Sequence, residues 1–311
     1  MELRRLRLLH EFSRRGTVAA VAEALSYSPS SVSVQLAELE REAGAKLLRR
    51  AGRNVELTAA GWRLAEHAAE ALAADETVRT ELARLGGGPR GRLRLTFVQS
   101  MALALLPGVL ARIGDTAPGL EVDVIHRETA PALEELRSRA VDLVVGIEYE
   151  AVPVGRHRDV ERRDLLREDV LLALHPRHPA LPARGPVRIA ACAESAWAAG
   201  HPGTGLDAVI RNVCNRLGGF APDIRHRSDD GLILSALVSS GRAVTLLPGL
   251  LATGMPQLTA RRLREERVQR TVFTAARTSA SGAPAVEAVR EALRHTARRI
   301  ASRRRILDVY P

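Results

Sequence analysis

The sequence predicts an α/β protein in three parts: an N-terminal winged helix-turn-helix, a long linker helix, and a two-lobed α/β region. Three observations lead to this prediction. Two short helical patterns meet at a sharp break between residues 17 and 40. The stretch Gly-Gly-Gly-Pro-Arg-Gly at 86–91 then interrupts a long helical pattern. Beyond it, strand-like apolar runs alternate with helical segments, which is typical of βαβ units.

Composition limits the class of protein. A chain of 311 residues, 46% of them apolar, suggests two or three domains with sizeable cores. Aromatic residues make up only 3%, which argues against single-stranded nucleic acid as a partner, since that binding uses stacking rings. The net charge of +10 favours a polyanionic partner, although the preference for Arg over Lys is also consistent with a coding bias.

Two features indicate a cytoplasmic protein. Cys192 and Cys214 match no metal-site spacing and no disulfide framework, so we expect free thiols in a reducing compartment. The N-terminus has no apolar signal region, and no apolar run reaches the roughly 18 residues that a membrane helix needs.

The helix-turn-helix prediction depends on residues 26–43. After a first helix at 3–15 and a second that begins near Val18, Ser28 can cap a third helix, and Pro29 suits its first position. Its opposite face is small and polar, with no charge as far as Ala37, so it suits close approach to base edges in a DNA groove. A small helical packing unit with a Ser-rich turn is the alternative. The residues of this helix that we expect to meet DNA are Ser28, Pro29, Ser30, Ser31, Ser33, Val34 and Gln35.

A hairpin is expected directly after this helix. Two short alternating stretches flank the segment at 51–54, which is a hairpin signal. Arg49, Arg50 and Arg53 would lie on or beside its tip, as a wing that contacts phosphate or the minor groove.

These residues resemble the LysR-type transcriptional regulators. The matching stretches are the helix-turn-helix at 17–40, Ser28 with Val32-Ser33 and Gln35, 39–44, 47–50 and 57–61. Two details depart from the family pattern. Val34 stands where a basic residue is common, so an apolar contact to a thymine methyl would replace it, and the proline comes one residue early. The resemblance implies a homodimer or homotetramer that reads an inverted-repeat promoter site in double-stranded DNA and responds to a small-molecule effector, with no cofactor.

Residues 59–85 are expected to form the linker helix. Its apolar seam has heptad spacing, which predicts dimerisation through this helix. The interruption at Asp75 would be either a register device or a position turned to solvent. The seam consists of Leu64, Ala68, Ala71, Asp75, Val78, Leu82 and Leu85.

The remaining chain is expected to form two α/β lobes. Strands at 92–97, 120–125 and 141–147 alternate with helices at 100–113 and 130–139, which predicts parallel pairing. Strands at 169–174 and 271–276 would cross between the lobes, and a last helix would run from Pro284 to about Arg305. The layout is similar to the effector-binding region of LysR-type regulators and to periplasmic binding proteins. The expected divisions are 1–58 for DNA binding, 59–85 for the linker, 86–91 for a hinge and 92–311 for the effector domain, with lobe I at 92–163 and 270–311 and lobe II at 164–269.

Ligands of open α/β sheets bind beyond the carboxyl ends of strands. Ser100 and the amide of Met101 follow the first strand and could hold an anion at a helix N-terminus; a plain helix cap is the alternative reading. The charged group at 225–227 beside His201 suggests a polar or anionic ligand. The other effector-binding candidates are Thr129, His201, Thr204, Arg227, Asp229 and Thr245.

Two other functions are the alternatives to a regulator. An enzyme is disfavoured because the sequence has no Ser elbow, no phosphate-binding Gly loop, no HExxH and no metal cluster, so we expect neither catalytic nor metal-binding residues. An architectural DNA-binding protein without an effector is the third possibility, and a filled cleft between the lobes would support it.

Overall fold

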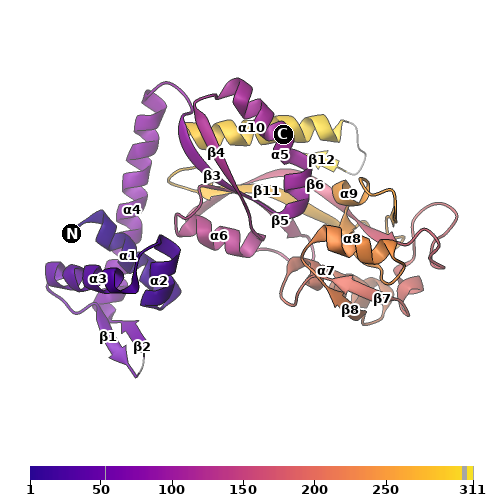
Figure 1. The fold of residues 1–311 in the computed structure, drawn as a ribbon, viewed down its shortest axis with the longest axis horizontal. Coiled ribbons are helices and arrows are strands. Elements are labelled where there is room, and N and C mark those ends of the chain that lie inside the picture. The colour runs from indigo at the N-terminus through magenta and orange to yellow at the C-terminus, as the bar shows by residue number, and fades with distance from the viewer. Residues whose placement is uncertain (53, 303–306, 311) are drawn as a thin grey trace.

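The computed structural model describes residues 1–52, 54–302 and 307–310, so Arg53, residues 303–306 and Pro311 lie outside it. The N-terminal head lies at one end of the molecule, beside the long helix α4 (Figure 1). Its core is built from the facing sides of three helices and includes Leu9, Phe12, Val21 and Leu36. The head consists of α1 (Leu3–Arg15), α2 (Val18–Leu25), α3 (Pro29–Ala43), β1 (Leu48–Ala51) and β2 (Asn54–Leu57).

Side-chain caps define the turn between α2 and α3. Thr17 accepts a hydrogen bond from the Ala20 amide at the start of α2, and Ser28 accepts one from the Ser31 amide at the start of α3. Pro29 occupies the first turn of α3, as predicted. β1 and β2 pair in the expected antiparallel hairpin.

Helix α4 (Ala59–Leu85) confirms the predicted helix but only part of its seam. Helix α4 packs on α1 through a stripe of buried residues that overlaps the heptad seam only at Ala68. Ala68 is fully buried in the core of the head. That stripe is Gly61, Ala65, Ala68 and Leu72. The seam residues are exposed to solvent only at the C-terminal end of α4, where Val78, Leu82 and Leu85 are 53%, 62% and 83% exposed. Asp75 accepts a hydrogen bond from Arg79, one turn further on.

The first lobe begins with the predicted βαβαβ unit. β3 (Gly91–Phe97) pairs in parallel with both β4 (Leu120–His126) and β5 (Leu143–Tyr149). The connections are α5 (Gln99–Thr116) and α6 (Thr129–Arg137). The whole sheet is mixed, because the long crossing strands β6 (Val160–Leu174) and β11 (Gln269–Arg277) pair antiparallel to their neighbours, in the order β10-β6-β11-β5-β3-β4.

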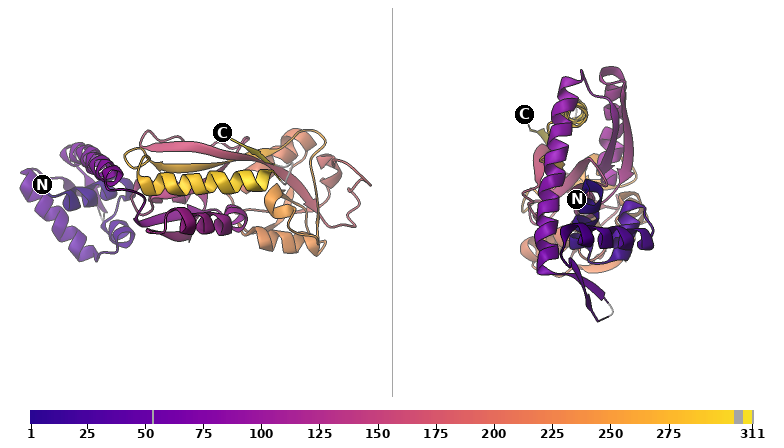
Figure 2. Two further views of the ribbon diagram at one scale, coloured as in Figure 1. Left: turned by 90° about the horizontal axis from the view of Figure 1, so that it is seen from above. Right: turned by 90° about the vertical axis from the view of Figure 1, so that its left-hand side faces the viewer.

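Helix α10 (Pro284–Ala301) packs beside α5 and covers one face of this sheet (Figure 2). It ends before the predicted Arg305, and β12 (Leu307–Val309) returns to pair with β6. None of the helices in the described part of the chain is long and apolar enough to cross a membrane.

The second lobe has its own core around Trp197. Asp230 caps α8 by accepting hydrogen bonds from the amides of Leu232 and Ile233. Strands β7, β10 and β12 and helix α9, each three or four residues long, were not predicted. The lobe contains β7 (Ala196–Ala199), α7 (Gly205–Val213), β8 (Asp223–Arg227), α8 (Gly231–Ser239), β9 (Thr245–Pro248), α9 (Gly249–Ala252) and β10 (Thr259–Arg261).

Cys192 and Cys214 are buried, unbridged thiols in this core. Burial raises the pKa of Cys192 to about 11, and burial together with the neighbouring Cys192 raises that of Cys214 to about 12. Both groups therefore remain protonated and unreactive near neutral pH.

Candidate functional site

The outward face of α3 is small, polar and accessible. Ser28, Pro29, Ser30, Ser33 and Val34 are exposed, whereas Ser31 and Gln35 are half-buried. Val34 is 59% exposed, so an apolar side chain stands in the middle of a polar face without packing on the head. Such a methyl-bearing side chain suits the methyl group of thymine in the major groove.

Gln35 is held in place from α1. Its Oε1 accepts a hydrogen bond from Arg5 Nε at 3.0 Å, and Arg5 also pairs with Glu42. Because the carbonyl oxygen is engaged, the amide nitrogen of Gln35 is left to donate outward. No local pattern in the sequence identifies Arg5, because the two residues lie thirty positions apart.

The wing presents arginines beside this face. Arg49 and Arg50 are both exposed on β1. Arg49 lies 3.5 Å from Glu56 on β2, whereas Arg50 has no ion pair with any residue that the structure describes. Arg53, the third predicted wing residue, lies outside the described residues.

A cavity of about 410 Å³ lies between the two lobes. The first turns of four helices border it, two from each lobe, and they supply Ser100, Ala130, Gly205 and Gly231. The partial positive charge of four helix N-termini is therefore directed towards this space. A hydrogen bond from the Gly231 amide to Gln99 Oε1, 2.8 Å long, joins α8 to α5 beside it.

A buried ion pair lies at one wall of the cavity. Arg270 on β11 donates to Glu168 on β6, with Nη2 and Oε2 2.7 Å apart and both side chains almost fully buried. Burial opposes the charge on Arg270, but Glu168 more than offsets this and raises its pKa. Arg270 Nη2 also donates to Ser100 Oγ at 2.9 Å, so the hydroxyl hydrogen of Ser100 remains available to a ligand.

Carboxylates make up the rest of the charged lining. Asp229 accepts from the backbone amide of His201 at 3.0 Å and pairs with its Nδ1 at 2.8 Å. Glu148 pairs with Arg162 at 2.7 Å. Burial raises the pKa of Glu128, and His126 beside it opposes that rise only in part.

Four of the predicted effector residues line the cavity: Ser100, Thr129, Thr204 and Asp229. The hydroxyl of Thr129 accepts from the Ile147 amide, and that of Thr204 donates to the His201 carbonyl, so both also stabilise the fold. Gln99, Glu128, Tyr149 and Arg270 line the cavity as well, and sequence reasoning missed them.

The other four predicted effector residues do not line this cavity. Met101 is fully buried in the first lobe's core, and Thr245 is fully buried and donates to the Ala198 carbonyl at 2.7 Å. Arg227 is held by Asp207 at 2.7 Å, and His201 reaches the cavity only through Asp229. The expectation of a polar or anionic ligand came in part from the charged group at 225–227, and none of these three residues lines the cavity, so that expectation stays a prediction.

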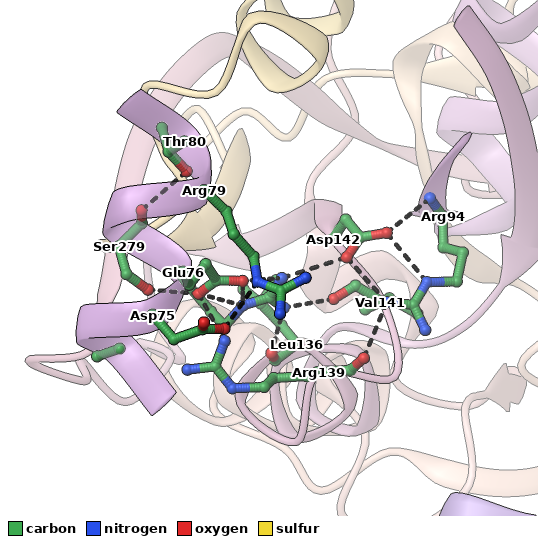
Figure 3. A network of polar contacts seen from close by, with 12 residues as sticks. Asp75, Glu76, Arg79, Thr80, Arg94, Leu136, Arg139, Val141, Asp142 and Ser279 are labelled. Atoms are coloured by element: carbon green, nitrogen blue, oxygen red, sulfur yellow. Dashed lines mark hydrogen bonds and ion pairs between the residues drawn. The ribbon is translucent and has the colours of Figure 1, made fainter. Parts of the chain in front are cut away.

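A polar network joins α4 to the first lobe (Figure 3). The Glu76 carboxylate pairs with Arg277 at 2.9 Å and with Arg139 at 2.7 Å, and it accepts from the Ser279 hydroxyl. Arg277 also donates to the Leu136 and Val141 carbonyls at 2.8 and 2.6 Å. The linker helix is thus fixed to the end of a crossing strand.

Comparisons with known proteins agree with this architecture. Residues 3–62 match the family described as bacterial regulatory helix-turn-helix protein, lysR family, and residues 86–298 match the LysR substrate binding domain. The transcriptional dual regulator GltC of Bacillus subtilis is 28% identical over 80% of this chain and 81% of its own length. A probable hydrogen peroxide-inducible genes activator of Mycobacterium avium is 30% identical over 78% of this chain and 76% of its own.

Solved structures share the fold. A full-length OxyR variant from Pseudomonas aeruginosa superposes with a TM-score of 0.67 at 21% identity, covering 94% of this chain and 95% of that one. Full-length CbnR complexed with its target DNA superposes with a TM-score of 0.54 at 23% identity, covering 95% of this chain and 100% of that one. Since the two family matches cover the helix-turn-helix and nearly all of the α/β region, the chain belongs to the LysR family of bacterial transcriptional regulators, and is a DNA-binding regulator rather than an enzyme.

Proposed function

We propose that the chain acts as a homodimer or higher homo-oligomer in the cytoplasm, reading an inverted-repeat promoter site through α3 and the wing. A small-molecule effector in the cavity between the lobes would modulate that binding. The observation that carries the proposal is the cavity itself, which is bordered by four helix N-termini and lies on the same chain as an exposed α3 face. An unfilled cavity of about 410 Å³ favours an effector-responsive regulator over a purely architectural protein.

The proposed division of the chain follows its separate cores. Residues 1–58 form the DNA-binding head, 59–85 the linker, 86–91 the hinge and 92–311 the effector domain. The head core takes in Ala65 and Ala68 of the linker but no residue beyond the hinge, and the cores of the effector domain take in none before it, which supports the boundary at 86–91.

The lining predicts an effector with both polar and apolar parts. Ser100 and backbone amides in the first turns of α5, α6 and α7 offer donors, and Glu128 and Asp229 offer acceptors. Leu234 and Leu247 provide an apolar wall. A ligand that bound the open and closed arrangements of the lobes equally well would change nothing, so the proposal requires unequal affinity for the two arrangements.

DNA binding tests the first half of the proposal. Fluorescence anisotropy with the intergenic DNA beside the protein's own gene, at two salt concentrations, would compare wild type with Gln35→Ala. We expect Gln35→Ala to weaken specific binding by roughly tenfold to hundredfold, with little effect on random DNA. Gln257→Ala is the matched control, since Gln257 is exposed in the second lobe. If the protein bound random DNA as tightly as the intergenic DNA, and Gln35→Ala changed neither affinity, sequence-specific recognition by α3 would be contradicted.

A thermal-shift screen of small metabolites tests the second half. Ala130 lines the cavity, and a larger side chain there would occupy the space without touching the Arg270–Glu168 pair. Ala130→Leu should therefore abolish the response to an effector while leaving DNA binding unchanged. An effector that stabilised Ala130→Leu as well as wild type would have to bind elsewhere.

A further inference from the structure

A second cavity, of about 760 Å³, lies where the head, the linker helix and the first lobe meet. Its walls come from α1, the end of α2 and the turn that follows it, the middle of α4, and the first lobe. The charged side chains of the lining are unbalanced, with six arginines against three carboxylates. They are Arg4, Arg7, Arg79, Arg94, Arg139 and Arg277, and Asp75, Glu76 and Asp142.

The three carboxylates are already engaged. Glu76 is shared by Arg139 and Arg277. Asp142 accepts two hydrogen bonds from the guanidinium of Arg94, at 3.0 and 2.9 Å. Asp75 pairs with Arg79 at 2.8 Å. No carboxylate of the lining is therefore left for the two arginines on the head.

Those two arginines, Arg4 and Arg7, have no ion pair and no side-chain hydrogen bond to any residue the structure describes. Arg4 lies over the ring of Tyr27, 5.1 Å from its centroid. Arg7 Nε is completely shielded and has no partner. A buried donor without an acceptor is costly, and such groups usually mark a missing ligand or water.

The electrostatics of Arg7 agree with this. Burial lowers its pKa, and the charges of Arg139 and Arg94 across the cavity lower it further. Glu11 opposes that shift, but Glu11 is itself paired with Arg15 at 2.8 Å. Like charges from the head and from the body thus face the same space.

We propose that this junction cavity binds a small oxyanion with two or more negative charges, of the phosphate or di- and tricarboxylate kind. Guanidinium groups match the paired oxygens of such anions with bidentate hydrogen bonds. The anion would contact Arg4 and Arg7 on the head and the guanidiniums of the first lobe together. Since only this arrangement of head and body brings those groups around one space, the bound anion stabilises it.

The test is a thermal-shift titration of the full-length protein with potassium phosphate or potassium citrate, against potassium chloride at equal ionic strength. We expect a saturable rise in the Tm of the wild type that chloride does not reproduce. Arg7→Gln should raise the midpoint concentration about tenfold, since a charged hydrogen-bond partner is lost. Arg4→Gln should raise it too, and this variant guards against a folding defect because Arg4 is exposed.

Arg298→Gln is the matched control, since Arg298 is exposed on α10, outside this cavity, and its loss changes the net charge equally. A response to phosphate alone, to citrate alone or to both supports the proposal and identifies the kind of anion. A response no larger than that of chloride overturns it, as does wild-type behaviour of both Arg4→Gln and Arg7→Gln. Ala130→Leu separates the two cavities: if it removes the response, the anion binds between the lobes and the junction proposal fails.

Discussion

Glu76 on the linker helix pairs with Arg277 at the end of β11, with Oε1 and Nη2 2.9 Å apart. The same strand carries Arg270, which lines the cavity between the lobes and bonds to Ser100. Seven residues of extended strand span roughly 23 Å. One continuous strand therefore links the proposed effector cavity to the helix that carries the DNA-binding head.

Glu76→Gln should loosen this junction. We expect the free energy of unfolding to fall by about 1–3 kcal/mol, because Arg277 and Arg139 lose the charge that compensates theirs in a largely buried place. Urea denaturation of the full chain measures the loss. Asp75→Asn is the control, since it removes the adjacent, more exposed pair with Arg79 and should cost less than about 0.5 kcal/mol. Equal losses would show that Glu76 contributes no more than a surface ion pair.

The stabilising effect of the Glu76 carboxylate also depends on pH, and the lowered pKa of Glu76 gives the direction of that dependence. Burial alone would raise its pKa, but Arg277, Ser279 and Arg139 more than offset burial, and the net pKa lies below 4.5. A carboxyl whose pKa is lower in the folded state stabilises the fold above its unfolded pKa. That contribution is complete above about pH 4.5 and disappears as the pH falls through the lowered value.

His10 should destabilise the protein at a higher pH. Burial, followed by the nearby charges of Arg14, Arg139 and Arg137, lowers its pKa from 6.5 to about 4. As the pH falls, His10 is therefore protonated near pH 6.5 in the unfolded chain but only near pH 4 in the folded protein. We expect stability to fall by about 2–3 kcal/mol between these values, relative to its full value above pH 6.5.

Urea denaturation midpoints at pH 7.5, 6.0 and 5.0 would show the His10 effect. His10→Gln should flatten the slope over this range. Substitution of His67, an exposed residue of α4, is the matched control and should keep the wild-type slope. A wild-type slope that survives His10→Gln would assign the proton uptake to another group.

Gly61→Ala should disrupt the head. A Cβ on Gly61 would lie 2.2 Å from the Leu47 carbonyl oxygen, which is backbone and cannot turn aside. We expect a loss of about 2–3 kcal/mol, although alanine is the better helix former. Gly114→Ala on α5 is the control, because nothing lies within 4 Å of its Cβ, and it should stabilise the protein by about 0.5–1 kcal/mol. Thermal melting of both variants decides between the two effects, because close packing predicts a lower Tm for Gly61→Ala and helix propensity predicts a higher one.

The head could be predicted from sequence because its signals are local. The Ser28 cap, Pro29 and the hairpin each occupy a few consecutive residues, and the structure has all of them. Strand β7 (Ala196–Ala199) of the second lobe could not be predicted, since it is four residues long and its burial does not alternate. Its pairing with β8 depends on neighbours distant in the chain.

Only the cavity residues with a local sequence signal could be predicted. Ser100 and Thr129 follow strands directly, so the rule that ligands bind beyond strand ends identifies them. Arg270 lines the cavity from the start of a crossing strand and is held by Glu168, about a hundred positions away, which no local pattern indicates. Thr245, an expected effector contact, donates instead to the Ala198 carbonyl, because side chains alternate along a strand and the sequence alone does not fix which face each one occupies.

The heptad spacing of the linker helix predicts that another surface covers its apolar seam, but it does not identify that surface. The first half of the seam lies against the head of the same chain, whereas Val78, Leu82 and Leu85 remain exposed. If a second copy of the chain covers them, Leu82→Glu should weaken the dimer by roughly tenfold or more, since a charge would be buried without a partner. Ala83→Glu adds the same charge one position round the same helix, to an exposed side chain outside the seam, and should leave association unchanged. Sedimentation velocity over a concentration series measures both, and equal behaviour of the two variants would place the dimer contact elsewhere on the molecule.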